Sequence, residues 1–159
     1  MRTARSFALL MLATSMGCVT EKSEPAPPKP LILALTPRAA PACASAPATA
    51  TGTVTIIVAS DGSSITATVV YSGLSGEPTA AHFHFGKPGA AGPVVLPFTG
   101  SLTSPFSKTF TSADYVAAAG APPDFASFVI AFKAGGTVYV NVHTAACRPG
   151  EIRADIPSA

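Results

Sequence analysis

The sequence predicts an all-β fold, a single antiparallel Greek-key sandwich or barrel with one or two short helices inserted before the last two strands. Two observations lead to this prediction. Short segments rich in β-branched residues recur between residues 31 and 156, and turn-forming clusters of Gly, Pro, Ser and Asp separate them at intervals of about 8–12 residues. Apolar residues follow a helical period only in one region near the C-terminal end.

Strands are expected where β-branched and apolar residues lie between two turn signals. A short edge strand at 31–35 ends at Pro37, and the Ala- and Pro-rich stretch 38–51 is expected to be irregular. A hairpin follows, with Asp-Gly-Ser-Ser at 61–64 as its turn. The remaining expected strands are 53–60 and 65–71 in that hairpin, then 80–86, 94–98, 106–110, 137–144 and 150–156.

Two short helices are expected before the last two strands. Ser112 can cap a helix over 113–119, which Gly120 would end. Asp124 can cap a second helix that extends to residue 134. Four apolar residues of the second helix share one face and indicate packing against the core: Phe125, Phe128, Val129 and Phe132.

Residues 1–17 have the pattern of an export signal and are not expected to belong to the fold. Arg2 and Arg5 precede an apolar run at 7–13 that is too short to span a bilayer as a mature helix. Cys18 directly follows Gly17, which resembles the cleavage and lipidation site of bacterial lipoproteins. Ordinary signal-peptidase cleavage is the alternative, because Ser15 stands where lipoproteins usually carry a larger apolar residue.

The next segment, 18–30, is expected to consist of the lipid-anchor cysteine and a tether. It contains four prolines, which favour an extended, polyproline-like backbone without a packed core. Residues 31–159 then form a single β domain. The predicted location is the cell envelope outside the cytoplasm, with membrane contact through the lipid alone, or secretion if Cys18 is not lipidated.

The cysteine count supports export. The chain has three cysteines, Cys18, Cys43 and Cys147, and lipidation of the first leaves the other two as a pair. Disulfides persist outside the cytoplasm, so we expect a bond between Cys43 and Cys147; two buried free thiols are the alternative.

Charge excludes some classes of partner. The chain has ten basic residues, and loss of Arg2 and Arg5 with the signal leaves eight basic against eight acidic residues. No basic stripe suited to nucleic acid is present, and we expect an unidentified partner outside the cytoplasm.

All three histidines of the chain lie in expected strands. His82 and His84 are two residues apart, so both point to the same face while Phe83 points to the other. In the strand 137–144, His143 shares its face with Tyr139 and Asn141. If the polar faces of the two strands adjoin, three imidazoles converge, and such a set can bind Cu(II) or Zn(II).

A purely structural role is the alternative for these histidines. Buried imidazoles need hydrogen-bond partners, and a polar network can supply them without a metal. Asn141, Glu151 and Arg153 are the expected supporting members of that network, and the proline- and glycine-rich turn at 88–93 is a candidate partner.

Four ordered motifs resemble those of the CHRD domain family, which is named after chordin. They read Ala-His-Phe-His-Phe-Gly at 81–86, Pro-Gly-Ala-Ala-Gly-Pro-Val-Val at 88–95, Tyr-Val-Asn-Val-His-Thr at 139–144 and Gly-Glu-Ile-Arg at 150–153. The resemblance covers about residues 31–157 and implies a β fold in an exported or extracellular setting. It implies no catalytic activity.

A more remote likeness is to copper/zinc superoxide dismutase, also a Greek-key barrel. Carried over by motif, its copper ligands would be His82, His84 and His143, and Arg153 would stand where that family guides its substrate. The chain has no fourth histidine to bridge two metals, so a dinuclear site is excluded.

Two functions are therefore predicted for the chain. The first is an exported CHRD-domain module that binds a partner or has a structural role without catalysis. The second is a mononuclear copper protein that uses the three histidines. The common motifs of serine hydrolases, zinc proteases and phosphate-binding loops do not occur in the sequence.

Overall fold

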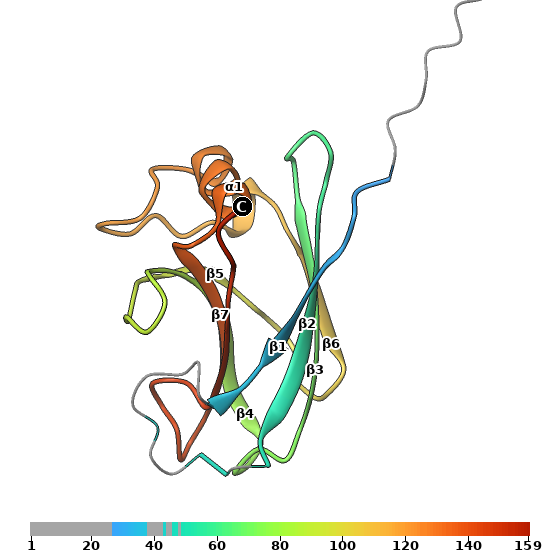
Figure 1. Ribbon diagram of the computed structural model, residues 1–159, viewed down its shortest axis with the longest axis vertical. Helices are drawn as coiled ribbons and strands as arrows, with labels where there is room; N and C mark the ends of the chain where they lie inside the picture. The colour runs from blue at the N-terminus through green and yellow to red at the C-terminus, as the bar shows by residue number, and fades with distance from the viewer. Residues whose placement is uncertain (1–26, 38–42, 44–45, 48) are drawn as a thin grey trace, which may run out of the picture.

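Two four-stranded antiparallel sheets pack face to face in this protein (Figure 1). The computed structural model describes residues 27–37, 43, 46–47 and 49–159. The strand order is β1-β2-β3-β6 in the first sheet and β5-β4-β7-β8 in the second. The predicted all-β sandwich, with its helix before the last two strands, is thus confirmed.

The observed strands follow the expected segments closely. Their bounds are β1 Leu31–Leu35, β2 Thr51–Val58, β3 Ile65–Ser72, β4 Pro78–Phe85, β5 Val94–Pro97, β6 Phe106–Phe110, β7 Val138–Thr144 and β8 Ile152–Asp155. The predicted hairpin is the pair β2 and β3, whose antiparallel register runs from Thr51 opposite Ser72 to Val58 opposite Ile65.

The core lies between the sheets and is lined by alternate residues of each strand. Val54 and Ile56 of β2 are buried there, whereas Thr53 and Thr55 between them point outward. Phe83 of β4 is fully buried, and its ring packs edge-on against Phe110 with the centroids 5.5 Å apart. Because Phe83 points inward, its neighbours His82 and His84 lie on the outer face of the second sheet.

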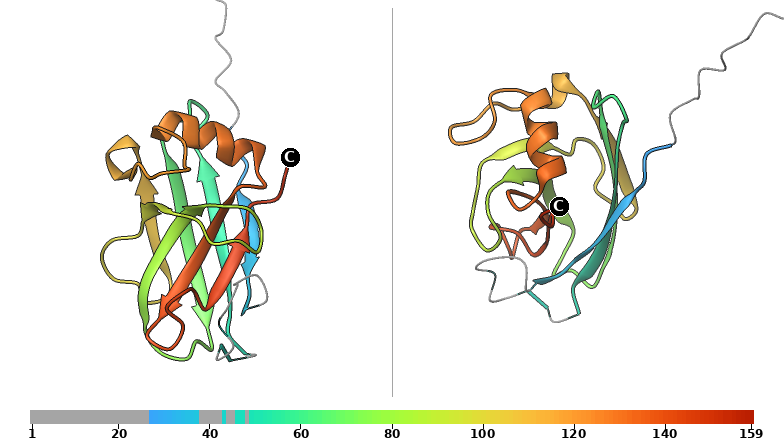
Figure 2. Two further views of the ribbon diagram at one scale, coloured as in Figure 1. Left: turned by 90° about the vertical axis from the view of Figure 1, so that its left-hand side faces the viewer. Right: turned by 45° about the horizontal axis from the view of Figure 1, so that its top comes forward.

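The helix α1, Phe125–Ala134, lies across one end of the sandwich (Figure 2). Asp124 is its N-cap and accepts a hydrogen bond from the Ser127 backbone N–H at 2.7 Å, as the sequence predicts. Gly135 ends the helix with a φ of 69°, a conformation that favours glycine. The predicted apolar face, Phe125, Phe128, Val129 and Phe132, is buried and closes this end of the core.

The other predicted helix, at 113–119, was wrong. Only a 3-10 turn at Ser112–Asp114 forms, and Thr111 rather than Ser112 occupies its N-cap position. The Asp114 carboxylate accepts from the Thr111 backbone N–H, which closes the turn on itself. Val116 then donates its backbone N–H to the Val95 carbonyl, 2.9 Å away, so the chain pairs with β5 instead of continuing a helix.

Two links join the edges of the sheets on the β1 and β8 side. Thr36, just after β1, forms an isolated bridge with Arg153 of β8 through two backbone hydrogen bonds of 3.0 and 3.1 Å. The predicted disulfide between Cys43 and Cys147 is present, with the Cα atoms 5.6 Å apart and a sequence separation of 104.

The N-terminal predictions concern residues that are not described. The export signal 1–17, Cys18 and the first part of the tether lie outside the described residues. None of the helices that the structure describes has the length and apolar character needed to cross a membrane.

Candidate metal centre

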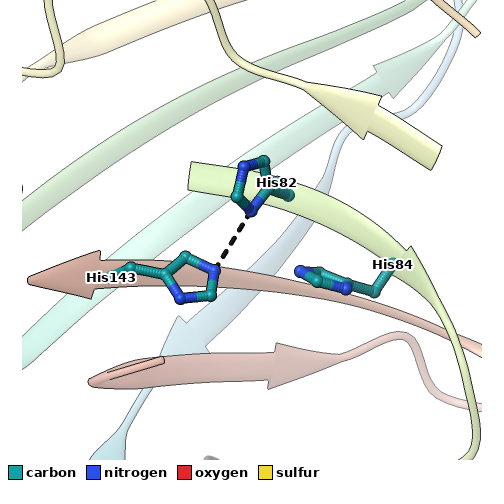
Figure 3. Close-up of side chains that lie close together, drawn as sticks. All are labelled: His82, His84 and His143. Atoms are coloured by element: carbon teal, nitrogen blue, oxygen red, sulfur yellow. Dashed lines mark hydrogen bonds between the residues drawn. The ribbon is translucent and has the colours of Figure 1, made fainter. Parts of the chain in front are cut away.

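The three histidines converge on the outer face of the second sheet (Figure 3). His82 and His84 extend from β4, and His143 extends from the adjacent strand β7. The antiparallel register places His143 opposite Ala80 and Asn141 opposite His82, so the three imidazoles occupy neighbouring positions on one face. The convergence expected from side-chain alternation is therefore present.

The ring nitrogens are close enough to share one ligand. Nδ1 of His82 lies 3.1 Å from Nε2 of His143, and one nitrogen from each ring lies within 4.8 Å of the other two. A point then exists at most about 2.8 Å from all three nitrogens, compared with metal–imidazole bonds of about 2.0–2.1 Å. Small side-chain rotations would bring the three rings to bonding distance of one ion.

Backbone carbonyls fix the tautomers of two of the rings. His143 Nδ1 lies 2.7 Å from the Arg148 carbonyl oxygen, and His84 Nδ1 lies 2.8 Å from that of Gly92. A carbonyl only accepts hydrogen bonds, so each Nδ1 carries the proton. In the neutral rings, Nε2 of both histidines is then left with a free lone pair.

Those lone pairs are only partly satisfied within the protein. His82 Nδ1 can donate to His143 Nε2, but His84 Nε2 is buried and has no hydrogen-bond partner. The Asn141 Oδ1 atom is likewise buried without a partner. The two side chains are 7 % and 2 % exposed, so both unpartnered atoms are buried within the site.

All three histidines are held in the neutral form. Desolvation, with repulsion from the other two imidazoles, lowers the pKa of His82 to about 4. Burial is also the largest cause that lowers the pKa of His84 and of His143, although their carbonyl partners act in the opposite direction. At neutral pH no ring has to lose a proton to solvent before a cation binds, but the proton of His82 must move from Nδ1 to Nε2 before Nδ1 can act as a ligand.

The loop between β4 and β5 lies against the site because of close backbone contacts. His84 bonds to the Gly92 carbonyl, and the Gly92 backbone N–H donates to the Tyr139 hydroxyl at 3.0 Å. A Cβ at Gly92 would lie 1.9 Å from the Phe85 carbonyl oxygen, so no other residue fits there without movement. The predicted contact between a histidine and the turn 88–93 is thus observed for His84.

Arg153 also binds the loop between β4 and β5 through hydrogen bonds to its backbone. Its guanidinium donates to the carbonyl oxygens of Lys87 and Ala90 at 3.0 and 2.8 Å and pairs with Asp155 at 2.6 Å. The side chain is fully buried, and its guanidinium carbon lies 3.3 Å from the centre of the Tyr139 ring. This placement leaves the guanidinium no exposed surface for a substrate.

Glu151 belongs to a separate part of the network. Its buried carboxylate accepts hydrogen bonds from the Ser75 backbone N–H and hydroxyl and from the Thr144 hydroxyl. Thr144 follows His143 directly, so Glu151 fixes the end of β7 that carries this histidine. The predicted supporting residues Asn141, Glu151 and Arg153 all lie beside the site, but only Asn141 presents an unsatisfied atom.

Sequence reasoning missed Tyr139 as a member of the site. Its ring stacks on the His84 imidazole, with the centroids 4.7 Å apart and the planes inclined by 3°. Arg153 covers the opposite side of the same ring. The signal was present in the sequence, because Tyr139 shares the face of β7 that carries Asn141 and His143.

The chemistry of the donor set suits a borderline or soft cation. Among the described residues, the cluster consists of three neutral imidazoles and contains no carboxylate or thiolate. Copper and zinc favour imidazole ligands, whereas calcium and magnesium favour oxygen. Three protein ligands also leave a coordination position open for an external ligand.

The family comparison agrees with the motifs. A family model described as the CHRD domain matches residues 33–156, from β1 to the end of β8. No curated protein and no solved structure matches the chain.

Proposed function

Since the chain belongs to the CHRD domain family, we propose that it is an exported, non-catalytic module and that this module binds one copper ion. The ligands are Nδ1 of His82 and the Nε2 atoms of His84 and His143. The ion is held on the outer face of the second sheet, between β4, β7 and the loops that cover them.

One observation carries the metal proposal. Three imidazole nitrogens converge in the site, and only one hydrogen, shared by His82 and His143, is available to them. A structural network accounts for His82 and His143, which can share one proton. It does not account for His84 Nε2, which is buried and unpartnered beside them. A buried polar atom without a partner costs about 1–3 kcal/mol, and a cation bound by all three rings removes that cost.

Copper is favoured over the other imidazole-binding metals. Divalent ions follow an order of affinity in which Cu(II) binds nitrogen ligands more tightly than Zn(II), and nothing in the donor set reverses that order. The neutral rings also suit copper in either oxidation state, because no anionic ligand discriminates between Cu(I) and Cu(II). Zinc is the competing ion in the test below.

Export and membrane attachment are part of the same proposal. The disulfide between Cys43 and Cys147 fits an oxidising compartment, and the family setting is extracellular. We place the domain outside the cytoplasm, attached through a lipid on Cys18 and separated from the bilayer by the proline-rich tether.

The test is metal binding by the mature protein without an affinity tag. We expect one equivalent of Cu(II) after dialysis, with an EPR spectrum that shows nitrogen coupling from imidazoles, and weaker uptake of Zn(II). The variant His82→Ala/His84→Ala should lose this copper, whereas Lys133→Ala, which changes an exposed side chain of α1, should keep it. Substoichiometric uptake in the unmodified protein, or equal uptake in the double histidine variant, would reject the proposal.

A further inference from the structure

Asn141 has a position at this site that the three-histidine set does not explain. It lies on β7 between Tyr139 and His143, on the same face, and directly opposite His82 of β4. The side chain is 2 % exposed, yet its Oδ1 atom has no hydrogen-bond partner. A buried asparagine with an unpaired oxygen lowers the folding free energy gained, and a hydrophobic residue of the same size would avoid this loss.

The orientation of the amide is fixed from the other side. Nδ2 donates to the Pro149 carbonyl oxygen at 3.3 Å, which identifies the remaining atom as the acceptor. Gly150 packs closely behind the amide, since a Cβ there would lie 2.5 Å from Nδ2. The amide therefore cannot rotate freely, and Oδ1 remains the atom that is not bonded to Pro149.

The Asn141 side chain lies close to the His84 ring, which carries the other buried atom of the site that has no hydrogen-bond partner. The amide opposes the lowering of the pKa of His84, as an acceptor close to the ring does, although the contact does not reach hydrogen-bond geometry. His84 Nδ1 is already committed to the Gly92 carbonyl, so the nitrogen on this side is Nε2. The site thus contains two buried acceptors without partners, His84 Nε2 and Asn141 Oδ1. An ion bound to Nε2 satisfies the histidine and leaves Oδ1 without a partner.

Asn141 Oδ1 then needs a hydrogen-bond donor, and the fourth ligand of the bound ion can supply one if it carries a hydrogen. The cluster supplies no negative charge of its own, so a bound ion keeps its positive charge and attracts a small external ligand. His82 is the partly exposed member of the three, so solvent reaches the site on its side. An oxygen ligand that carries a hydrogen can bind the ion and donate to Asn141 at the same time.

We propose that Asn141 is a positioning residue that selects the fourth ligand of this centre: it favours protic oxygen ligands, water and hydroperoxide, over ligands without a hydrogen. The inference rests on the proposed copper function and adds a ligand class to it. A ligand such as azide would displace the hydrogen-bonded water and leave Oδ1 unpaired again, which penalises its binding.

The experiment compares azide binding to the copper-loaded unmodified protein and to Asn141→Leu, which keeps the volume but removes the acceptor. Azide affinity is read from its charge-transfer band, and copper affinity is measured by competition with a chelator. We expect Asn141→Leu to bind azide about tenfold more tightly, with copper affinity within about threefold of the unmodified protein. Asn141→Asp, which keeps an acceptor at the same place, should not gain azide affinity.

Two results would overturn the inference. Equal azide affinity in the unmodified protein and Asn141→Leu would show that the amide does not act on the fourth ligand. A fall of more than about a hundredfold in copper affinity would make Asn141 a direct ligand instead of a positioning residue.

A second measurement needs no variant and covers the case in which Asn141→Leu does not fold. Pulsed EPR of the unmodified copper protein in H₂O and D₂O should show strongly coupled exchangeable protons from a coordinated water. Their absence would also overturn the inference. If the unmodified protein binds no copper, the proposed function fails; if it binds copper through three imidazoles but either result above is found, only the role of Asn141 fails.

Discussion

Nδ1 of His82 lies 3.1 Å from Nε2 of His143, although 61 residues separate the two in the sequence. The antiparallel pairing of β4 with β7 creates this contact, and the carbonyl of Arg148 keeps the His143 nitrogen free of a proton. The separation is close to the roughly 3.3 Å between two nitrogens on one tetrahedral metal ion. The pair is therefore prepared for a metal before one binds.

Acid should destabilise the metal-free protein in a defined pH range. The pKa of His82 is lowered to about 4, and the pKa values of His84 and His143 are lowered in the same direction, whereas an unfolded chain has histidine pKa values near 6.5. The unfolded state therefore binds more protons than the folded state between about pH 6.5 and pH 4. The histidine contribution to the free energy of unfolding should therefore be largest above pH 6.5, and the free energy of unfolding should fall as the pH decreases toward 4.

Urea unfolding with a chelator present, at pH 7.0, 5.5 and 4.5, measures this dependence. The variant His82→Ala should show a shallower fall over the same range, because one of the three groups has been removed. The three aspartates with lowered pKa values, Asp61, Asp114 and Asp124, act below about pH 4 and do not contribute to this window. A pH-independent free energy between 7.0 and 4.5 would contradict the prediction.

Replacement of Arg153 by methionine should destabilise the fold by about 2–4 kcal/mol, because it removes the side-chain donors of the Ala90 and Lys87 carbonyls and the ion-pair partner of Asp155. The matched control is Arg148→Met, which removes the same charge from an exposed side chain and should change the free energy of unfolding by less than about 0.5 kcal/mol. Chemical denaturation of both variants at pH 7 makes the comparison. Similar losses in the two variants would mean that net charge, and not the loop contacts, determines the effect.

The disulfide should add substantially to stability. It joins Cys43 and Cys147 across a sequence separation of 104, and loss of such a bond costs about 2–5 kcal/mol. The variant Cys43→Ser/Cys147→Ser should therefore unfold at lower denaturant concentration than the oxidised protein. Mass spectrometry of the exported protein without reductant should find the two cysteines linked, and two alkylatable thiols at these positions would contradict the bond.

Membrane attachment should depend on Cys18 alone. In a bacterial host that processes lipoproteins, the full chain should partition into the membrane fraction and incorporate labelled palmitate. Cys18→Ser should release the folded domain from that fraction, because the variant lacks the thiol that would carry the lipid. Secretion of the unmodified protein without label would instead indicate cleavage by an ordinary signal peptidase.

Local sequence patterns were sufficient for much of this structure. Alternation placed His82 and His84 on one face of β4 and His143 on the polar face of β7, and the cap residue Asp124 located α1, whereas the adjacency of the two strands comes from the structure. These features depend on residues close together in the chain. The division of eight strands into two sheets depends on pairing between distant segments, which the sequence pattern alone does not specify.

The errors and omissions have tertiary causes. The helix expected at 113–119 is absent because Val116 pairs with Val95, a contact across 21 residues that outweighs helix propensity. The protonation of His84 and His143 depends on loop carbonyls at Gly92 and Arg148, whose positions no periodicity reveals. Those carbonyls support the proposed metal site over a purely structural network, because they leave Nε2 of both rings unprotonated.

The most direct test of the central claim is a crystal structure of the copper-loaded protein with anomalous data collected at the copper edge. We predict one anomalous peak about 2.0–2.1 Å from Nδ1 of His82 and from Nε2 of His84 and His143. A peak at any other place, or none at these three nitrogens, would contradict the claim and leave the histidines as members of a purely structural network.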